Sequence, residues 1–567
     1  MRRCHAFCLS SLAAVLVTGL TLMAGARAQQ RPNLPSGALP DIRLQQLAPL
    51  PAPQLAPEIP VPETAPARVP AGAEAVRLVF GGFIIDGTTA YPPGKLEAIW
   101  QPEVGREITL AEVYRLARDV QQTYRAEGYF LSRVIIPEQR VRDGRFTLRV
   151  LEGYIDAVTF EGDVGPAQGL IAAYFEPVTR ERPIRLATLE RALLLANDVP
   201  GVHATALLRS SAKQPGAADL LVTADRRRFA GMLSVDNEGD DFTGEWEASA
   251  NVSANALTAL GEQLTVTGFA SEPWNTHAEE VGQASGSLRL GPSGAYLETL
   301  ASYGDSNPGA SLEELDFDSK SLLLSVVAGY PVVRTRDLSL AVRLGFDYIN
   351  EDTDQFGGQT FSRDRLRVLH VTGRGEIRDS LGGANSGEIS LRQGLPVLDA
   401  TRRSDDDKSR ENGTGSATLV RASAARLQPL VGSLAAYGNV ASQYAFDHLL
   451  SEEQFDLGGS QFGRGYNFSE VSGDDGVGAT FELRYSWRPD ADIAVSLQPF
   501  SFYDVGTVWQ RGISEAQTLS SAGVGLRAAI FDSLSIELTM AKPLAAKSQR
   551  ADDTRDPQFL FRSIGRF

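Results

Sequence analysis

Residues 244–256 read "GEWEASANVSANA" and alternate between polar and apolar side chains without interruption. The apolar members occupy every even position from Trp246 to Ala256, and the polar members occupy every odd position from Glu245 to Asn255. Because successive side chains of a β-strand point to opposite faces, this stretch predicts a strand with one apolar and one polar face. Such strands suit either a soluble β-sandwich or a membrane barrel with lipid outside and water inside.

The same alternation recurs in "LSLAVRLGFDY" at 338–348 and in "SLSIELTMA" at 533–541. Strands of about 10 residues can cross a bilayer when tilted, and polar stretches such as residues 350–365 predict long loops between short turns. Closing the sheet on itself also leaves no unpaired edge. Residues 229–567 therefore predict a transmembrane antiparallel β-barrel of about 16 strands. A soluble sandwich is the alternative.

The chain ends in "QFLFRSIGRF", which places Phe559, Phe561 and the terminal Phe567 on one face of a last strand. An aromatic C-terminal residue that closes an alternating strand resembles the signal read by the outer-membrane assembly machinery. We therefore predict that these three phenylalanines form the assembly signal. The resemblance also places the barrel in the outer membrane of a Gram-negative bacterium.

Residues 1–28 have the pattern of a secretory signal peptide, with two early arginines, a mostly apolar core and a small-x-small cleavage site at 26–28. Both cysteines of the chain fall within it, so the mature chain is expected to lack disulfides. Residues 29–75 contain 11 of the 30 prolines and predict an extended, solvated linker. A tethered recognition peptide is the alternative for this segment.

Residues 76–153 and 154–228 predict two small α+β modules. In the first, Thr109 and Glu112 form a capping box that begins a helix, and the Asp143-Gly144 pair predicts a hairpin turn. In the second, "RLATLERALLLANDVPG" at 185–201 predicts a helix stopped by Pro200-Gly201, and strands follow at 203–211 and 218–225. The size and order of these elements resemble POTRA domains, the periplasmic modules of outer-membrane assembly and secretion proteins.

The charge balance argues against nucleic acid as a partner. The formal charge is −16, and it falls to −19 after residues 1–28, which carry three arginines and no acidic residue, are removed. The few histidines are scattered, so the sequence predicts no metal site and no cofactor. No phosphate-binding loop and no nucleophile–base pair is visible, and we expect a conduit with no catalytic residues.

Two short motifs interrupt the barrel pattern: "GRGY" at 463–466 and "FYDVG" at 502–506. In the second motif Phe502 and Asp504 share one strand face, so Asp504 faces the lumen if Tyr503 meets lipid. A carboxylate in a crowded lumen favours a cation, and the planar fork of an arginine can bind it through two parallel hydrogen bonds. The alternative is an ordinary polar loop beside an ordinary lumen-facing aspartate.

The order of signal peptide, proline-rich linker, two POTRA-like modules and barrel resembles the TpsB transporters of two-partner secretion. These include the hemolysin secretion/activation proteins and the filamentous-hemagglutinin transporter. The resemblance implies that the Arg-Gly-Tyr tip of a long extracellular loop folds into the barrel and meets the aspartate of the Phe-x-Asp-x-Gly strand. It assigns a gating or loop-clamp role to Arg464, Gly465, Tyr466 and Asp504.

The resemblance implies capture of an unfolded, secreted TpsA-type partner protein by exposed POTRA strand edges, here near 204–210 and 220–224. It also implies contact with outer-membrane lipid and lipopolysaccharide, and with the barrel assembly machinery and periplasmic chaperones during biogenesis. Known members carry an N-terminal helix that plugs the pore. The prolines of residues 29–75 leave about two helical turns at most, at 41–48, so a plug of that kind is in doubt here.

Three other functions are compatible with parts of the sequence. A BamA/TamA-like factor that inserts other barrels shares POTRA domains and the Arg-Gly-Tyr loop, but usually has a different number of POTRA domains. A general porin does not explain the two periplasmic modules. A soluble adhesive β-protein does not explain the terminal Phe567 or the strand lengths.

Overall fold

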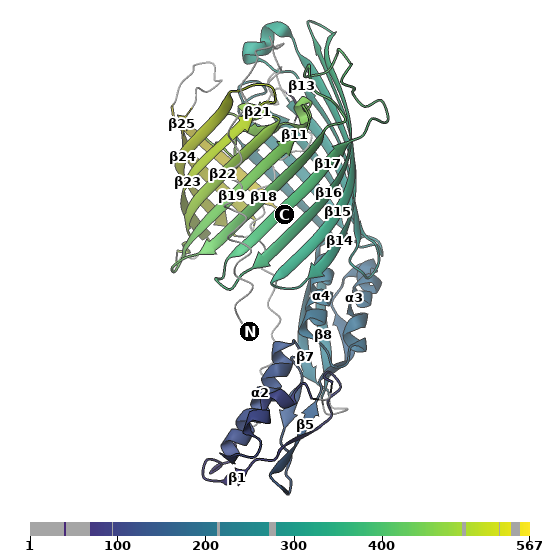
Figure 1. The fold of residues 1–567 in the computed structure, drawn as a ribbon. Helices are drawn as coiled ribbons and strands as arrows, with labels where there is room; N and C mark the ends of the chain where they lie inside the picture. The colour runs from purple at the N-terminus through teal and green to yellow at the C-terminus, as the bar shows by residue number, and fades with distance from the viewer. Residues whose placement is uncertain are drawn as a thin grey trace.

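The computed structural model describes residues 39–40, 69–92, 94–211, 216–271, 279–489, 495–531, 533–545 and 556–567. A tall barrel of tilted strands lies above two small α+β domains, which follow one another below it (Figure 1). The predicted signal peptide, most of the predicted linker and the 41–48 segment lie outside the described residues. The domain boundaries given above therefore stay predictions.

The first α+β domain packs one helix on a three-stranded sheet of order β2-β5-β4. The capping box forms as expected, because the Glu112 amide donates to Thr109 Oγ1 at 3.2 Å and the Thr109 amide donates to Glu112 Oε2 at 2.7 Å. Apolar residues of the helix and the sheet, including Val113, Tyr124 and Leu148, form a buried core. The elements are β1 (Arg77–Val79), β2 (Gly82–Asp86), η3 (Glu97–Ile99), η4 (Gln101–Glu103), β3 (Glu107–Thr109), α2 (Leu110–Ala126), β4 (Arg133–Ile135) and β5 (Arg145–Leu151).

The second domain has a sheet of order β6-β8-β7 covered by two helices. Its elements are β6 (Tyr154–Glu161), η5 (Gly165–Ala167), α3 (Gln168–Arg180), α4 (Leu186–Asn197), β7 (Val202–Ser210) and β8 (Ala217–Arg226). The expected free edge at 220–224 is wrong, because these residues lie in β8, which pairs with β6 on one side and β7 on the other. The expected edge at 204–210 lies in β7, which is an edge strand of this sheet.

Sixteen strands form a closed barrel in which the last strand, β26, pairs back to the first, β9. They are β9 (Phe229–Asp236), β10 (Glu247–Asn255), β11 (Gln263–Ser271), β12 (Glu279–Arg289), β13 (Tyr296–Ser306), β14 (Asp318–Arg334), β15 (Leu338–Gln355), β16 (Gln359–Arg378), β17 (Ala384–Gly394), β18 (Thr418–Pro429), β19 (Leu434–Ala445), β22 (Asp475–Tyr485), β23 (Val495–Trp509), β24 (Ala516–Ile530), β25 (Leu534–Ala545) and β26 (Gln558–Arg566), with η6 (Ala310–Leu315) between β13 and β14. All neighbouring pairs are antiparallel, which confirms the predicted barrel and its strand number.

The prediction of a long loop at 350–365 is wrong. These residues belong to β15 and β16, which are 18 and 20 residues long and are joined by a tight turn at 356–358. Beyond the membrane both faces of a strand meet water or other loops, so the apolar alternation disappears although the ladder continues. The long connections that the structure describes are residues 395–417, between β17 and β18, and residues 446–474, between β19 and β22.

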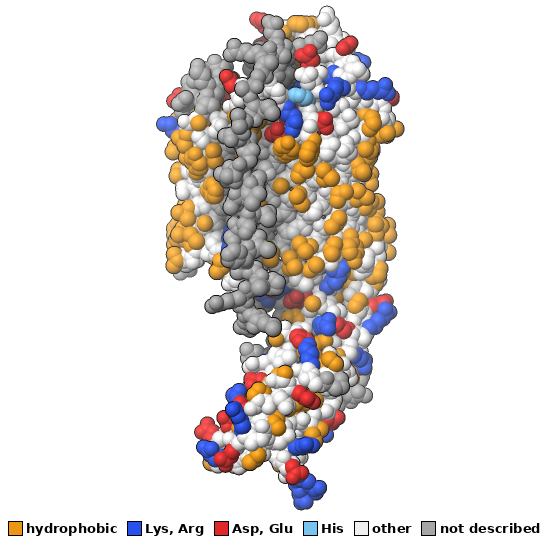
Figure 2. Space-filling model, in the orientation of Figure 1, with side chains coloured by type: hydrophobic (Ala, Val, Ile, Leu, Met, Phe, Trp, Pro, Cys, Tyr) orange, Lys and Arg blue, Asp and Glu red, His pale blue; other side chains and the backbone are white. Residues whose placement is uncertain are grey.

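The outer surface of the barrel is apolar. Val252 is 54 % exposed, whereas Ser249 and Ser253, on the opposite face of the same strand, are buried. Figure 2 shows apolar side chains over the visible flanks of the barrel, while charged side chains gather toward its upper end and on the domains below. The apolar outer surface and the polar lumen match a barrel immersed in lipid. Among the described residues, no helix is both long and apolar enough to cross a membrane.

The second α+β domain is attached to the lower end of the barrel. Asp198, just after α4, accepts hydrogen bonds from Arg334, the last residue of β14. Arg334 Nη2 donates at 2.6 Å and Arg334 Nε at 3.0 Å. Arg191 of α4 donates to the carbonyl oxygen of Ser293, in the turn after β12, at 3.0 Å, and to that of Pro331, near the end of β14, at 3.2 Å. These contacts fix the domain beneath one side of the barrel and place the 446–474 loop at the opposite, outer end.

Candidate functional site in the barrel lumen

The connection 446–474, called the lumen loop below, is folded into the barrel. It contains the single turn η7 (Ser451–Glu453) and a short hairpin of β20 (Phe455–Leu457) and β21 (Val471–Gly473). Phe462, Arg464 and Tyr466 are 5 %, 6 % and 2 % exposed, which is unusual for a loop. Their burial shows that the tip of the loop packs against the inner wall.

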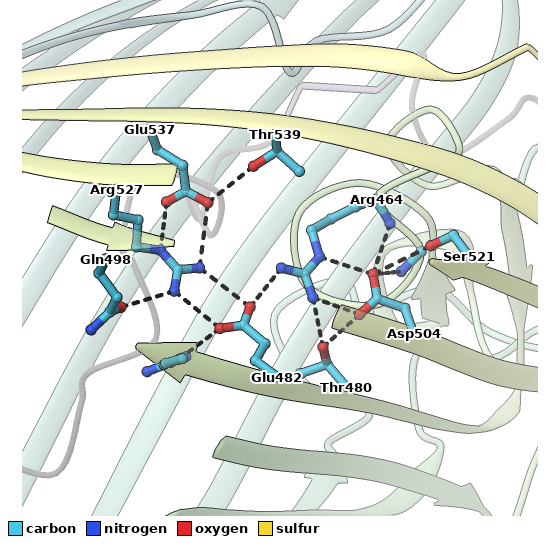
Figure 3. A network of polar contacts seen from close by, with 11 residues as sticks. Arg464, Thr480, Glu482, Gln498, Asp504, Ser521, Arg527, Glu537 and Thr539 are labelled. Atoms are coloured by element: carbon cyan, nitrogen blue, oxygen red, sulfur yellow. Dashed lines mark hydrogen bonds and ion pairs between the residues drawn. The ribbon is translucent and has the colours of Figure 1, made fainter. Parts of the chain in front are cut away.

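Arg464 binds Asp504 of β23 through two parallel hydrogen bonds. Arg464 Nε lies 2.9 Å from Asp504 Oδ2, Nη2 lies 2.8 Å from Oδ1, and the Arg464 amide also donates to Oδ2 at 3.1 Å (Figure 3). Thr480 and Ser521 donate to the same carboxylate from the two neighbouring strands. Asp504 is wholly buried. The structure therefore brings together the two charged residues that the motifs suggested.

Arg464 has a second carboxylate partner, Glu482 of β22, which the sequence analysis did not identify. Arg464 Nη1 lies 2.6 Å from Glu482 Oε1. Glu482 also accepts hydrogen bonds from Arg484 Nε at 2.7 Å and Arg527 Nη1 at 3.0 Å, so three guanidinium groups surround one carboxylate. In the sequence, Thr480, Glu482 and Arg484 are polar residues two apart, separated by the apolar Phe481 and Leu483, and this spacing could have indicated them.

The lumen network is charge-balanced and rests on aromatic rings. The cations are Arg464, Arg484 and Arg527, and the anions are Glu482, Asp504 and Glu537. The guanidinium carbon of Arg464 lies 3.6 Å from the centre of the Phe502 ring, and that of Arg527 lies 3.9 Å from the Phe500 ring. Stacking on a ring face favours a cation that has lost water.

Gly465 and Tyr466 fix the tip against the adjacent strands β24 and β25. A Cβ atom on Gly465 would lie 2.7 Å from the Pro543 nitrogen and 3.0 Å from Ser521 Cβ, so the backbone can approach this closely only without a side chain. The Tyr466 hydroxyl donates to the carbonyl oxygen of Ser520 at 3.1 Å and also contacts that of Ala545. The four predicted clamp residues thus lie in one contact, while their gating role stays a prediction.

The three C-terminal phenylalanines lie away from this network, on the outer surface. Phe559 and Phe567 are 72 % and 61 % exposed, and the Phe561 ring lies 6.2 Å from the Trp246 ring. The Phe567 backbone exchanges two hydrogen bonds with Gly231 of β9, at 2.9 and 3.0 Å, so the last residue closes the barrel. Their use as an assembly signal stays a prediction.

A cavity of about 300 Å³ separates the lumen loop from the wall formed by β17, β18 and β19. It is lined by Gln443 and Phe462 and also by Leu39 and Pro40 of the predicted linker. Both linker residues are buried, so at this point the segment expected to be solvated lies inside the barrel. Across the residues that the structure describes, no cluster of three or more His, Cys, Asp or Glu is placed to hold a metal ion.

A closed, lipid-facing barrel of sixteen strands, two POTRA-type domains beneath it and an inward loop held by the network above define an outer-membrane transporter with periplasmic POTRA domains. The model of the haemolysin secretion/activation protein family, ShlB/FhaC/HecB, matches residues 216–528, and that of the ShlB-type POTRA domain matches residues 80–153. The chain belongs to the haemolysin secretion/activation family, whose members are TpsB transporters that export a secreted, TpsA-type partner protein.

Similar proteins share most of the chain at low identity. The heme/hemopexin transporter protein HuxB of Haemophilus influenzae (strain 86-028NP) is 24 % identical over 470 residues, covering 81 % of this chain and 82 % of its own. The outer membrane transporter CdiB of Dickeya dadantii (strain 3937) is 25 % identical over 392 residues, covering 67 % of each chain. The solved structure of CdiB from Escherichia coli is similar in fold, with a TM-score of 0.73 and 20 % identity over 91 % of this chain and 94 % of that chain.

Proposed function

We propose that this transporter captures an unfolded partner of the hemolysin, hemagglutinin or adhesin class in the periplasm and threads it through the barrel to the cell surface. The observation that carries the proposal is the lumen loop, whose buried tip occupies the space that a passing chain needs. Folding of the partner outside would then bias its passage outward. We also expect contact with outer-membrane lipid and lipopolysaccharide, and dependence on the barrel assembly machinery and periplasmic chaperones during biogenesis.

The edge strand β7 is the capture site that we propose. The Asn197 side chain accepts from the Ala204 amide at 3.0 Å and donates to the Ala204 carbonyl oxygen at 2.9 Å, so these groups point away from β8. Backbone groups two and four residues further, at Ala206 and Leu208, point the same way. An extended segment could therefore add to this edge by main-chain hydrogen bonds, while Asn197 limits how far it extends.

We propose that Arg464 is the clamp that holds the lumen loop in its resting position. Replacing Arg464 leaves the wholly buried Asp504 without its cation, and breaking a buried ion pair costs about 3–5 kcal/mol. Arg464→Ala should leave the barrel assembled, with heat-modifiable migration on gels, but should strongly reduce the amount of partner at the cell surface.

The matched control is Arg343→Ala. Arg343 pairs with Glu298 between two wall strands and does not contact the lumen loop through that pair. Normal export by Arg464→Ala would refute the clamp role. Equal loss of export in both variants would show a general effect of removing a lumen arginine.

A further inference from the structure

The first end of the lumen loop is bound to the wall by an ion pair that is separate from the clamp at its tip. Glu453, the last residue of η7, is 4 % exposed. Arg392 of β17 donates to it from Nε at 3.0 Å and from Nη2 at 2.7 Å, and Arg421 of β18 adds a contact at 3.2 Å. Here the loop supplies the anion and the wall supplies the cations, the reverse of the arrangement at Arg464.

Residues of the barrel wall hold Arg392 in place independently of the lumen loop. Arg392 Nη2 lies 3.0 Å from Asp347 Oδ2 of β15, and Ser325 of β14 donates to the other oxygen of Asp347 at 2.6 Å. The Gln443 side chain of β19 donates to the Glu453 carbonyl oxygen at 2.9 Å. This site therefore spans the strands from β14 to β19, a part of the wall that the Arg464 network does not use.

The second end of the loop is held at Asp474, which is wholly buried. Arg410 of the 395–417 connection forms a double contact with its carboxylate. The same carboxylate accepts from the Leu449 amide, near the start of the lumen loop, and from the Arg511 amide, after β23, both at 2.9 Å. The Asp474 carboxylate thus links the lumen loop, the 395–417 connection and the connection that follows β23.

We propose that Glu453 and Asp474 are fixed pivots, and that residues 454–473 are the part of the loop that leaves the lumen when the partner passes. The Arg464 ion pairs are with β22 and β23, whereas the Glu453 and Asp474 contacts described above are made by other residues, in β15, β17 and β18 and in the outer connections. Both pivots border the moving segment, and each is buried against structure that stays in place. This inference rests on the proposed function, because it requires that the tip move during export.

Two engineered disulfides distinguish the pivots from the moving segment. The Ser451 amide lies 3.1 Å from Ser409 Oγ, so Ser409→Cys with Ser451→Cys would bind the loop base to the 395–417 connection. A Cβ atom on Gly478 would lie 3.1 Å from Phe462 Cβ, close to the separation that a disulfide needs, so Phe462→Cys with Gly478→Cys would bind the tip to β22. Residues 29–567 contain no cysteine, so no other thiol competes.

Partner export is measured with each pair oxidised and after reduction of the same cells, which makes each variant its own control. We expect the oxidised base pair to export as well as the reduced one, and the oxidised tip pair to lose export and regain it on reduction. Export blocked by the oxidised base pair would overturn the pivots and leave the clamp proposal intact. Export unaffected by the oxidised tip pair would contradict the clamp and, with it, the moving segment.

A second readout needs no export assay. Glu453→Gln leaves Arg392 with Asp347 but releases the loop base, so an external protease should cut the lumen loop faster on intact cells. Glu298→Gln, which disrupts the wall-to-wall pair with Arg343, should not change the cutting of the loop. Equal cutting of the loop in wild type and Glu453→Gln would show that Glu453 does not hold the loop, and would overturn it as a pivot.

Discussion

At the scale of single residues, the lumen is organised around carboxylates that are each shared by several donors. Glu482 and Asp504 divide the guanidinium of Arg464 between them, and Glu482 also serves two further arginines. In water-poor surroundings such sharing lets few acidic groups hold several cations, while the loss of one acid leaves more than one charge without its partner. Glu482, which pairs with three arginines, should therefore contribute more to the stability of the barrel than Glu537, which pairs with one.

Glu482→Gln and Glu537→Gln test this ranking. Glu537 pairs with Arg527, which keeps Glu482 when Glu537 is changed, whereas Glu482→Gln weakens three ion pairs at once. We expect Glu482→Gln to lower barrel stability by about 3 kcal/mol and Glu537→Gln by clearly less. The temperature at which the folded gel band converts to the unfolded one measures both. A Glu537→Gln barrel that is as labile as the Glu482→Gln barrel would contradict the ranking.

At the scale of elements, alternation identifies strands well, but only where one face meets lipid. It predicts the strand at 244–256 and the barrel as a whole, and it fails at 350–365, where the same strands continue above the membrane with both faces polar. The helix α3 was also missed, since Pro177 interrupts its pattern although its buried residues pack on the sheet. The identification of β8 as an edge failed because strand order is set by long-range pairing, which local patterns do not encode.

The same difference between local patterns and long-range contacts explains which residues of the site the sequence indicated. Arg464 and Asp504 lie in short motifs with glycine and aromatic neighbours, and the resemblance of these motifs to those of the TpsB transporters implied their pairing. Glu453 meets Arg392 of β17 because the lumen loop folds onto the wall, and Arg410 meets Asp474 because two long connections fold against each other. A contact of that kind depends on the whole path of the loop rather than on any local pattern of residues.

The proposed capture edge makes a prediction for β7. Because the Ala206 amide points away from β8, Ala206→Pro should remove an outward donor and block the edge without breaking the pairing within the sheet. Loss of one main-chain hydrogen bond of about 1 kcal/mol would weaken partner binding roughly fivefold. Pull-down of the partner by the full-length transporter in detergent measures this, with Ala206→Ser, which keeps the amide, as the control. Equal binding by both variants would exclude β7 as the capture edge.

At the scale of the whole molecule, the proposed function places capture of the partner on the second POTRA domain and its passage in the barrel. These two parts must therefore stay aligned. The contacts of Asp198 and Arg191 hold the second POTRA domain against the turn after β12 and the end of β14, below the lumen. Both partners of the Asp198–Arg334 pair are partly buried, with side-chain exposures of 29 % and 22 %, so the pair is better shielded than a surface ion pair. A fixed joint of this kind would keep the β7 edge at a constant position relative to the pore.

A charge swap tests whether the joint matters for export. Asp198→Arg places two arginines together and should loosen the domain, at a cost of about 1.5–3 kcal/mol from the lost charged hydrogen bonds. Adding Arg334→Asp restores opposite charges, so the double variant should recover both the alignment and the export that the single variant loses. Spin labels on exposed positions of the domain and the barrel, Thr223 and Leu381, report the alignment as the width of their distance distribution. A single variant with a broadened distribution and undiminished export would show that the joint is not needed for passage, and that the partner reaches the pore from a mobile domain.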